Sequence, residues 1–199
     1  MRQRQVTEQP AILPNSAPSL ALVGMPGSGK STVGRHLARQ LGWNFVDSDH
    51  EIEQAIGGSI RAFFDQHGED AFRDLEQQTI AQLCRHSGTV LATGGGAVLR
   101  APNRGALQAH CRVIYLRSTP EELYRRLRHD TQRPLLQVRD PLKRLRDLYR
   151  ERDPLYRETA HFVIETGRPS VPTLVNMILM QLELAGHLPA RTQPHSPAA

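Results

Sequence analysis

Lysine and cysteine are both scarce in this chain of 199 residues. Lysine occurs only at Lys30 and Lys143, so almost all of the positive charge is carried by arginine. The two cysteines, Cys84 and Cys111, lack the spacing of a metal site, and two thiols do not form a disulfide framework. Cysteine-based metal sites and disulfide-stabilised folds are therefore disfavoured, and the two positions that keep lysine become more interesting.

The chain also lacks a long apolar run. No stretch approaches the roughly eighteen apolar residues of a membrane span. The segment AILPNSAP near the N-terminus is too short and too broken by proline to be the core of a signal peptide. We therefore expect a cytoplasmic protein with no membrane partner.

Aromatic residues are few, whereas positive charge is in excess. The formal net charge is +5 and the isoelectric point is near 9.8, which permits binding of nucleic acid or of a small anion but requires neither. A face that binds nucleic acid needs basic residues interleaved with aromatic ones. Many of the arginines instead cluster in 117–157, so we expect no nucleic-acid partner.

The order of apolar and amphipathic segments predicts one α/β domain over 19–184. Residues 1–18 and 185–199 are polar and rich in proline, so we expect both ends to be disordered. Short apolar segments typical of buried strands alternate with longer helical ones, which indicates a parallel sheet covered by helices on both faces. The five predicted strands are 19–24, 44–47, 89–94, 111–117 and 161–166. Among the predicted helices, 59–67 and 70–85 follow the second strand.

A phosphate-binding loop follows the first predicted strand. The segment GMPGSGKS, Gly24 to Ser31, fits the pattern G-x-x-x-x-G-K-[ST] and lies between a strand and a helix, which is the context that the motif requires. Glycines allow backbone N–H groups to converge on a phosphate, and the start of the helix adds partial positive charge. We therefore predict a nucleoside triphosphate site. Its predicted contacts are Gly27, Ser28, Gly29, Lys30, Ser31 and Thr32.

Several classes of protein share this loop, and most lack support here. A GTPase should carry an N-K-x-D segment, which the chain does not contain. The segment DQHG at 65–68 fits D-x-x-G in form, but it reads better as the end of a helix. The long apolar strand ending in Asp-Glu that is usual in motor ATPases is also missing. A kinase with a pocket for a small acceptor remains.

Two aspartates at the end of the second strand are the candidate metal and acceptor residues. Asp47 and Asp49 are two residues apart, so in a strand their side chains point the same way. Asp47 is placed to contact Mg²⁺ together with the Ser31 hydroxyl, because this ion prefers oxygen ligands. Asp49 could accept the proton or the hydrogen bond of an attacking hydroxyl. The alternative, that Asp49 only caps the next helix, stays open.

Glycines and arginines provide further candidates. Gly94, Gly95 and Gly96 follow the third strand, at the sheet edge where ligands bind in open α/β sheets; a tight structural turn is the alternative. Arg73 and Arg157 suit a bidentate grip on a carboxylate. Arg133 lies in the irregular segment 129–140, which suits a lid closing over the γ-phosphate. Taken singly, each of these arginines is more readily explained as a solvated surface charge.

Six segments, in this order and spacing, closely resemble shikimate kinase. The resemblance covers about Leu20 to Gln181. The segments are GMPGSGKS, DSDHEIE, FRDLE, TGGGAV, RPLL and DPLYRE. The resemblance implies a P-loop kinase fold in three layers, with a five-stranded parallel sheet, a mobile lid at about 129–140 and substrate-binding helices at about 48–86. It also implies Mg²⁺-dependent transfer of phosphate from ATP to the 3-hydroxyl of shikimate, in the route to aromatic amino acids.

The resemblance assigns individual roles as well. Asp49 would hold the shikimate hydroxyls, and Arg73 and Arg157 would hold its carboxylate with help from the glycine run at Gly94 and Gly95. Lys30 and Arg133 would act on the transferred phosphate, and Arg133 would touch ATP from the lid. Arg168, in the segment ETGRPS, would match an arginine near the adenine. Ser31 and Asp47 would bind the magnesium ion. The chain is also expected to be a monomer that uses ATP and shikimate.

Three other functions compete with this one. A related kinase for gluconate would need the loop but not the two arginines together with three glycines. A nucleic-acid-binding ATPase would fit the basic isoelectric point. A binding module without activity would be expected to have lost Lys30 or Asp49, and both are present.

Overall fold

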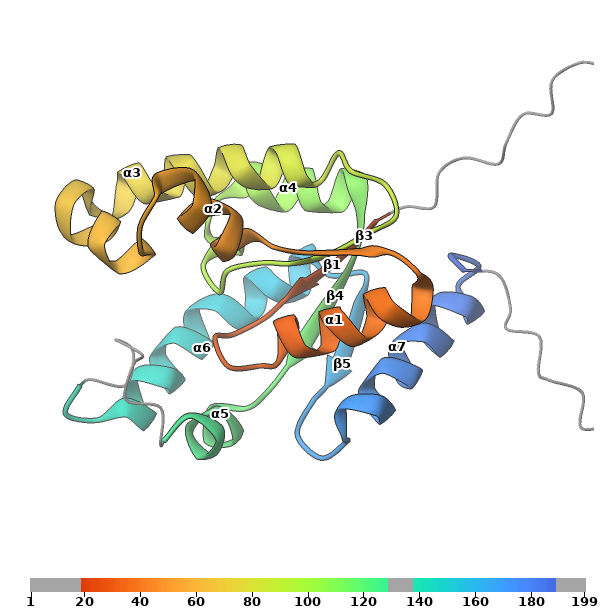
Figure 1. Ribbon diagram of the computed structural model, residues 1–199. Helices are drawn as coiled ribbons and strands as arrows, with labels where there is room; N and C mark the ends of the chain where they lie inside the picture. The colour runs from red at the N-terminus through yellow and green to blue at the C-terminus, as the bar shows by residue number, and fades with distance from the viewer. Residues whose placement is uncertain (1–18, 129–137, 189–199) are drawn as a thin grey trace, which may run out of the picture.

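The computed structural model describes residues 19–128 and 138–188, arranged around one parallel sheet. The sheet has five strands in the order β2-β3-β1-β4-β5 (Figure 1). The predicted extension at 1–18, the predicted lid up to residue 137 and the tail from 189 lie outside the described residues. The strands are β1 (Ser19–Val23), β2 (Asn44–Asp47), β3 (Thr89–Ala92), β4 (Cys111–Arg117) and β5 (Phe162–Glu165). The predicted five-stranded sheet is confirmed.

Helices cover both faces of the sheet and make three layers (Figure 1). The helices are α1 (Lys30–Leu41), α2 (Ser48–Ile56), α3 (Ile60–Leu83), α4 (Ala101–His110), α5 (Pro120–Leu127), α6 (Pro141–Thr159) and α7 (Val171–Leu184), with a 3₁₀ turn η1 (Ala97–Leu99). Side chains of β1 alternate between two cores, as the pleat of a strand requires. Leu20 and Leu22 pack with α1 and α7, whereas Ala21 and Val23 pack with α3, α4 and α6.

Helix α3 unites two helices that the sequence predicts as separate. Its backbone leaves helical geometry at Gly68, where φ is 81° and ψ is 175°. A positive φ of this kind favours glycine, because a Cβ would be strained there. The predicted helix end at DQHG is therefore present as a sharp kink, after which the chain continues into the half of α3 that carries Arg73.

The end of the domain is packed against the sheet. After α7, residues 185–188 form a turn in which His187 Nδ1 accepts a hydrogen bond from Arg112 Nε at 3.2 Å. The His187 ring also lies edge-on to Phe162, with ring centroids 6.0 Å apart. Residues 185–188, which belong to the predicted disordered tail, are thus placed by contacts with β4 and β5. Across the described ranges 19–128 and 138–188, no helix is long and apolar enough to cross a membrane.

Candidate active site

A single cleft brings the predicted segments together at the carboxyl ends of β1, β2 and β3. The cleft has a volume of about 410 Å³. Its lining includes the phosphate-binding loop after β1, both aspartates Asp47 and Asp49, and Gly95 from the glycine run after β3. Parallel strands present their carboxyl ends on one edge of the sheet, which is why three segments separated by up to about seventy residues converge there.

The phosphate-binding loop has the backbone of an anion cradle. Gly27 and Gly29 have φ values of 82° and 96°, and Gly29 is the residue that precedes α1. Lys30 is buried and its Nζ donates hydrogen bonds to the carbonyls of Gly24 and Met25, at 2.9 and 3.0 Å. The Ser28 hydroxyl is buried and has no hydrogen-bond partner among the described residues. A buried hydroxyl without a partner is costly, and a phosphate oxygen would satisfy it.

The residues on the predicted metal side fit Mg²⁺ by their chemistry. Ser31 Oγ donates a hydrogen bond to Asp47 Oδ2 at 2.6 Å, so a hydroxyl and a carboxylate lie together at the start of α1. Both are hard oxygen ligands of the kind that Mg²⁺ takes. Asp47 also caps α2, because its Oδ1 accepts from the Asp49 backbone N–H at 3.1 Å. Asp47 is therefore the capping residue.

Since Asp47 caps α2, the side chain of Asp49 is available for other contacts. It lines the cleft and lies so close to Gly94 that a Cβ at that glycine would be 2.5 Å from Asp49 Oδ1. Burial, and next the negative charge of Asp47, raise the pKa of Asp49 to about 6. The carboxyl group thus binds a proton more readily than an exposed aspartate does, which suits a group that exchanges a proton near neutral pH.

Each glycine of the run after β3 lies against a different part of the site. A Cβ at Gly94 would meet Asp49, one at Gly95 would lie 2.7 Å from Pro26 of the phosphate-binding loop, and one at Gly96 would meet the guanidinium of Arg73. The run thus lies against the phosphate-binding loop and also against Asp49 and Arg73. These close approaches explain the three glycines better than a tight turn alone.

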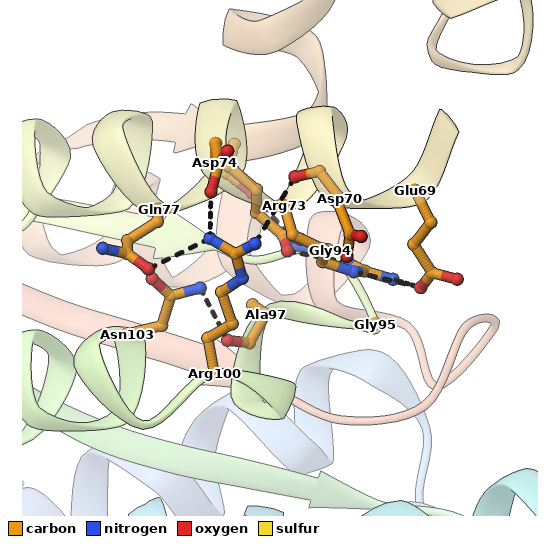
Figure 2. Close-up of polar contacts among 12 residues, drawn as sticks. Glu69, Asp70, Arg73, Asp74, Gln77, Gly94, Gly95, Ala97, Arg100 and Asn103 are labelled. Atoms are coloured by element: carbon orange, nitrogen blue, oxygen red, sulfur yellow. Dashed lines mark hydrogen bonds and ion pairs between the residues drawn. The ribbon is translucent and has the colours of Figure 1, made fainter. Parts of the chain in front are cut away.

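Arg73 is held in place by two glutamates of its own helix. Its Nη1 pairs with Glu76 Oε2 at 2.7 Å and its Nη2 with Glu69 Oε1 at 3.1 Å, and its side chain is 12% exposed. Figure 2 shows the guanidinium of Arg73 reaching toward Glu69. The Glu76 carboxylate is 1% exposed; burial raises its pKa, and the positive charges of Arg73 and then Arg152 oppose that rise. Glu76 therefore lies in the field of both arginines.

A second arginine connects the same helix to the segment after the glycine run. Arg100 Nη1 pairs with Asp74 Oδ1 at 2.5 Å, and its Nη2 donates to the backbone carbonyl of Asp70 at 3.4 Å (Figure 2). On the same segment, Asn103 Nδ2 donates to the Ala97 carbonyl at 2.9 Å. These contacts tie α3 to the loop that carries the glycines.

The structure does not bring Arg157 to the cleft. Its Nε pairs with Asp153 Oδ2 at 2.7 Å, and its side chain is 46% exposed. Arg152, five residues earlier on α6, has a side chain that is 13% exposed, and its Nη1 donates to the Gly95 carbonyl at 3.2 Å. The Nε of Arg152 is buried without a hydrogen-bond partner in the parts of the chain that the structure describes. Arg152 is therefore the arginine of this pair that contacts the glycine run, and the carboxylate-binding role of Arg157 stays a prediction.

The described structure does not test the roles of two further predicted residues. Arg133 lies in 129–137, outside the described residues. Arg168 is exposed in the loop between β5 and α7 and does not contribute to the described lining. Their roles stay predictions. By contrast Gly27, Gly29 and Thr32 line the cleft with Lys30 and Ser31, as the loop motif predicts.

A five-stranded parallel sheet with a phosphate-binding loop facing two aspartates and a glycine run defines a P-loop kinase fold. Comparison with known proteins gives the particular family. The family model described as shikimate kinase matches residues 26–183, and the chain belongs to the shikimate kinase family.

Individual relatives agree with this assignment. The chain is 62% identical to a shikimate kinase of Paracidovorax citrulli, over 86% of this chain and 95% of the relative. It is 54% identical to one of Ralstonia nicotianae, over 91% of this chain and 96% of the relative. Among solved structures, the shikimate kinase of Acinetobacter baumannii in complex with shikimate aligns with a TM-score of 0.80 at 48% identity, covering 85% of this chain and 94% of that one.

Proposed function

We propose that this protein transfers the γ-phosphoryl group of Mg-ATP to the 3-hydroxyl of shikimate, forming shikimate 3-phosphate and ADP. The observation that carries the proposal is one cleft in which the phosphate-binding loop faces a partly buried aspartate with a raised pKa, in a chain of the shikimate kinase family. The class of reaction is phosphoryl transfer to an alcohol. The product would feed the chorismate route to aromatic amino acids.

The phosphate-binding loop holds the triphosphate. Backbone N–H groups at the start of α1 and the partnerless Ser28 hydroxyl suit phosphate oxygens. Lys30 exchanges its two backbone carbonyls for phosphate oxygens, which are the better acceptors because they are charged. Ser31 and Asp47 would hold Mg²⁺, which when bound neutralises charge on the phosphates.

Asp49 binds and orients the acceptor hydroxyl. The hydroxyl oxygen forms a bond to the γ-phosphorus while the bond to the bridging oxygen of ADP breaks, and the proton leaves the hydroxyl. Asp49 is a suitable recipient for the hydrogen bond or for the proton, because its pKa is raised to about 6 by burial and by Asp47. Its close packing against Gly94 fixes its position beside the phosphate-binding loop.

Arg73 and Arg152 hold the acceptor's carboxylate. Both are largely buried, both lie against the glycine run, and both interact with the buried Glu76. Two guanidinium groups converging on one site suit a planar anion, since each offers paired N–H donors. The Nε of Arg152, which has no hydrogen-bond partner in the described structure, gains one when a carboxylate binds.

The remaining expected features concern the nucleotide and the state of the protein. We expect Arg133 to contact the γ-phosphate from a closing lid and Arg168 to lie near the adenine. We also expect a cytoplasmic monomer that uses only ATP and shikimate. These expectations derive from the motifs and the family, and Arg133 lies outside the described residues.

A coupled assay of ADP release tests the proposal. Purified protein with Mg-ATP is compared in three mixtures that contain shikimate, gluconate or no acceptor. ADP release that requires shikimate supports the proposal. Release that requires gluconate would assign the pocket to the related sugar-acid kinase, and equal slow release in all three mixtures would leave an ATPase without this acceptor.

A further inference from the structure

The hydroxyl of Tyr156 is buried beneath the glycine run. Tyr156 lies on α6 and is fully buried, and its hydroxyl donates a hydrogen bond to the Gly95 carbonyl at 2.5 Å. Its ring stacks on that of Tyr115, with centroids 4.9 Å apart and planes at 29°. Burial raises the pKa of Tyr156, so the group stays a neutral donor across the working range of the protein. It lies outside the lining of the cleft and does not take part in the reaction described above.

The Gly95 carbonyl accepts from two side chains at once. Besides Tyr156, Arg152 donates to it through Nη1 at 3.2 Å. A carbonyl oxygen has two lone pairs, so both of its acceptor positions are occupied. The Gly95 carbonyl oxygen therefore connects the glycine run to the buried ring of Tyr156 and to the guanidinium of Arg152.

We propose that Tyr156 is a positioning residue for acceptor binding, which fixes the Gly95 peptide and thereby the guanidinium of Arg152 before the acceptor arrives. The inference rests on the proposed function, in which Arg152 grips the acceptor's carboxylate. Without the hydroxyl, Arg152 alone would hold the Gly95 oxygen, and the loop and the guanidinium would have to be ordered when the acceptor binds. Ordering on binding weakens affinity without changing the bonds made in the complex.

The effect is confined to the acceptor side by the geometry of α6. Tyr156 reaches the Gly95 carbonyl, whereas its stacking partner Tyr115 donates its hydroxyl to Asp153 Oδ1 at 2.8 Å. Asp153 in turn pairs with the exposed Arg157. The two tyrosines therefore share one ring stack, but only the hydroxyl of Tyr156 contacts the glycine run. Tyr115 is a matched control.

Tyr156→Phe and Tyr115→Phe test the proposal in one kinetic series with Mg-ATP and shikimate. Tyr156→Phe should raise the shikimate KM roughly three- to tenfold, the equivalent of one lost hydrogen bond, and should leave kcat and the ATP KM nearly unchanged. Tyr115→Phe should leave the shikimate KM unchanged. An unchanged shikimate KM in Tyr156→Phe would overturn the proposal. So would an equal rise in both variants, or a parallel rise of the shikimate and ATP KM.

A second measurement needs no variant. In the unsubstituted protein, amide hydrogen exchange in a peptide covering 94–98 should be slow before shikimate is added and should change little afterwards. Fast exchange that slows only with shikimate would overturn the proposal, because the run would then be ordered by the acceptor. Shikimate-dependent ADP release by the unsubstituted protein is measured alongside. Its absence would contradict the proposed function, whereas its presence with an unaffected Tyr156→Phe would contradict only the role of Tyr156.

Discussion

The nucleotide side and the acceptor side of the cleft are built in different ways. The nucleotide side comes mainly from one continuous segment, 24–32, whose backbone turns and first helical residues make the phosphate cradle. The acceptor side is assembled from four separate parts of the chain, Asp49, 73–76, 94–96 and 152–156. The nucleotide side is therefore defined by local sequence, and the acceptor side depends on how α3 and α6 pack on the sheet.

The largest effect on activity is expected when the carboxylate of Asp49 is removed. Asp49→Asn should lower kcat by roughly 10²–10⁴-fold, the usual range for a general acid–base group. ATP affinity, measured by calorimetry, should persist, because the phosphate cradle is unchanged. Near-normal turnover would show that Asp49 is not an acceptor residue, and lost ATP binding would show that the two sides are not separable.

The next largest effect is expected on the shikimate KM, and it should differ between two arginines of α6. Arg152→Ala should raise the shikimate KM roughly 10–150-fold, since it removes a charge-assisted hydrogen bond of about 1.5–3 kcal/mol. Arg157→Ala is the matched control and should be close to the unsubstituted protein, because its partner is Asp153 and its side chain is 46% exposed. The reverse pattern in steady-state kinetics would restore Arg157 as the carboxylate-binding residue.

The choice between these arginines shows where sequence alone is insufficient. The loop motif, the pair of aspartates and the glycine run are read from adjacent residues, so their convergence in one cleft could be predicted. Which arginine of α6 reaches the glycines depends on the rotation of that helix about its axis. Arg152 and Tyr156 are four residues apart and lie within roughly 40° of each other around the helix. Their common partner, Gly95, is 57 residues from Arg152 in sequence.

Other features follow from packing that the sequence did not reveal. Glu76 is charged and yet 1% exposed, which is unusual unless the charge is paired. Its pairing with Arg73 is local, three residues apart on α3, but its burial follows only from the packing of α3 against the glycine run. The caps of α2 gave a similar result. The sequence left open that Asp49 caps this helix, whereas in the structure Asp47 accepts the Asp49 backbone N–H.

A smaller effect, on stability and on shikimate binding, is expected where Gly94 lies close to Asp49. Gly94→Ala should lower the free energy of unfolding by roughly 1–3 kcal/mol through overpacking against Asp49, and should weaken shikimate binding as well. Gly105→Ala is the matched control, because no atom lies within 4 Å of its added Cβ in α4. That variant should be stabilised by about 0.4–1 kcal/mol. Chemical denaturation with parallel kinetics checks both variants. Equal stability of the two would contradict the conclusion that Gly94 lies too close to Asp49 for a larger residue.

The smallest expected effect is on the nucleotide side. Arg168 is exposed in the loop between β5 and α7, so a contact with the nucleotide should contribute little. Arg168→Ala should raise the ATP KM by no more than about fivefold, as for other exposed charges, and should leave the shikimate KM unchanged. A rise beyond tenfold would make Arg168 a principal nucleotide contact, and the nucleotide side would then extend beyond its continuous segment.

The most direct test of the account is the structure of the product. Protein, Mg-ATP and shikimate are incubated together, and the product is examined by phosphorus-31 NMR with proton coupling. We expect a phosphomonoester whose phosphorus couples to the proton on carbon 3 of shikimate. Coupling to another ring proton, or only ADP and inorganic phosphate, would contradict the assignment of the acceptor side.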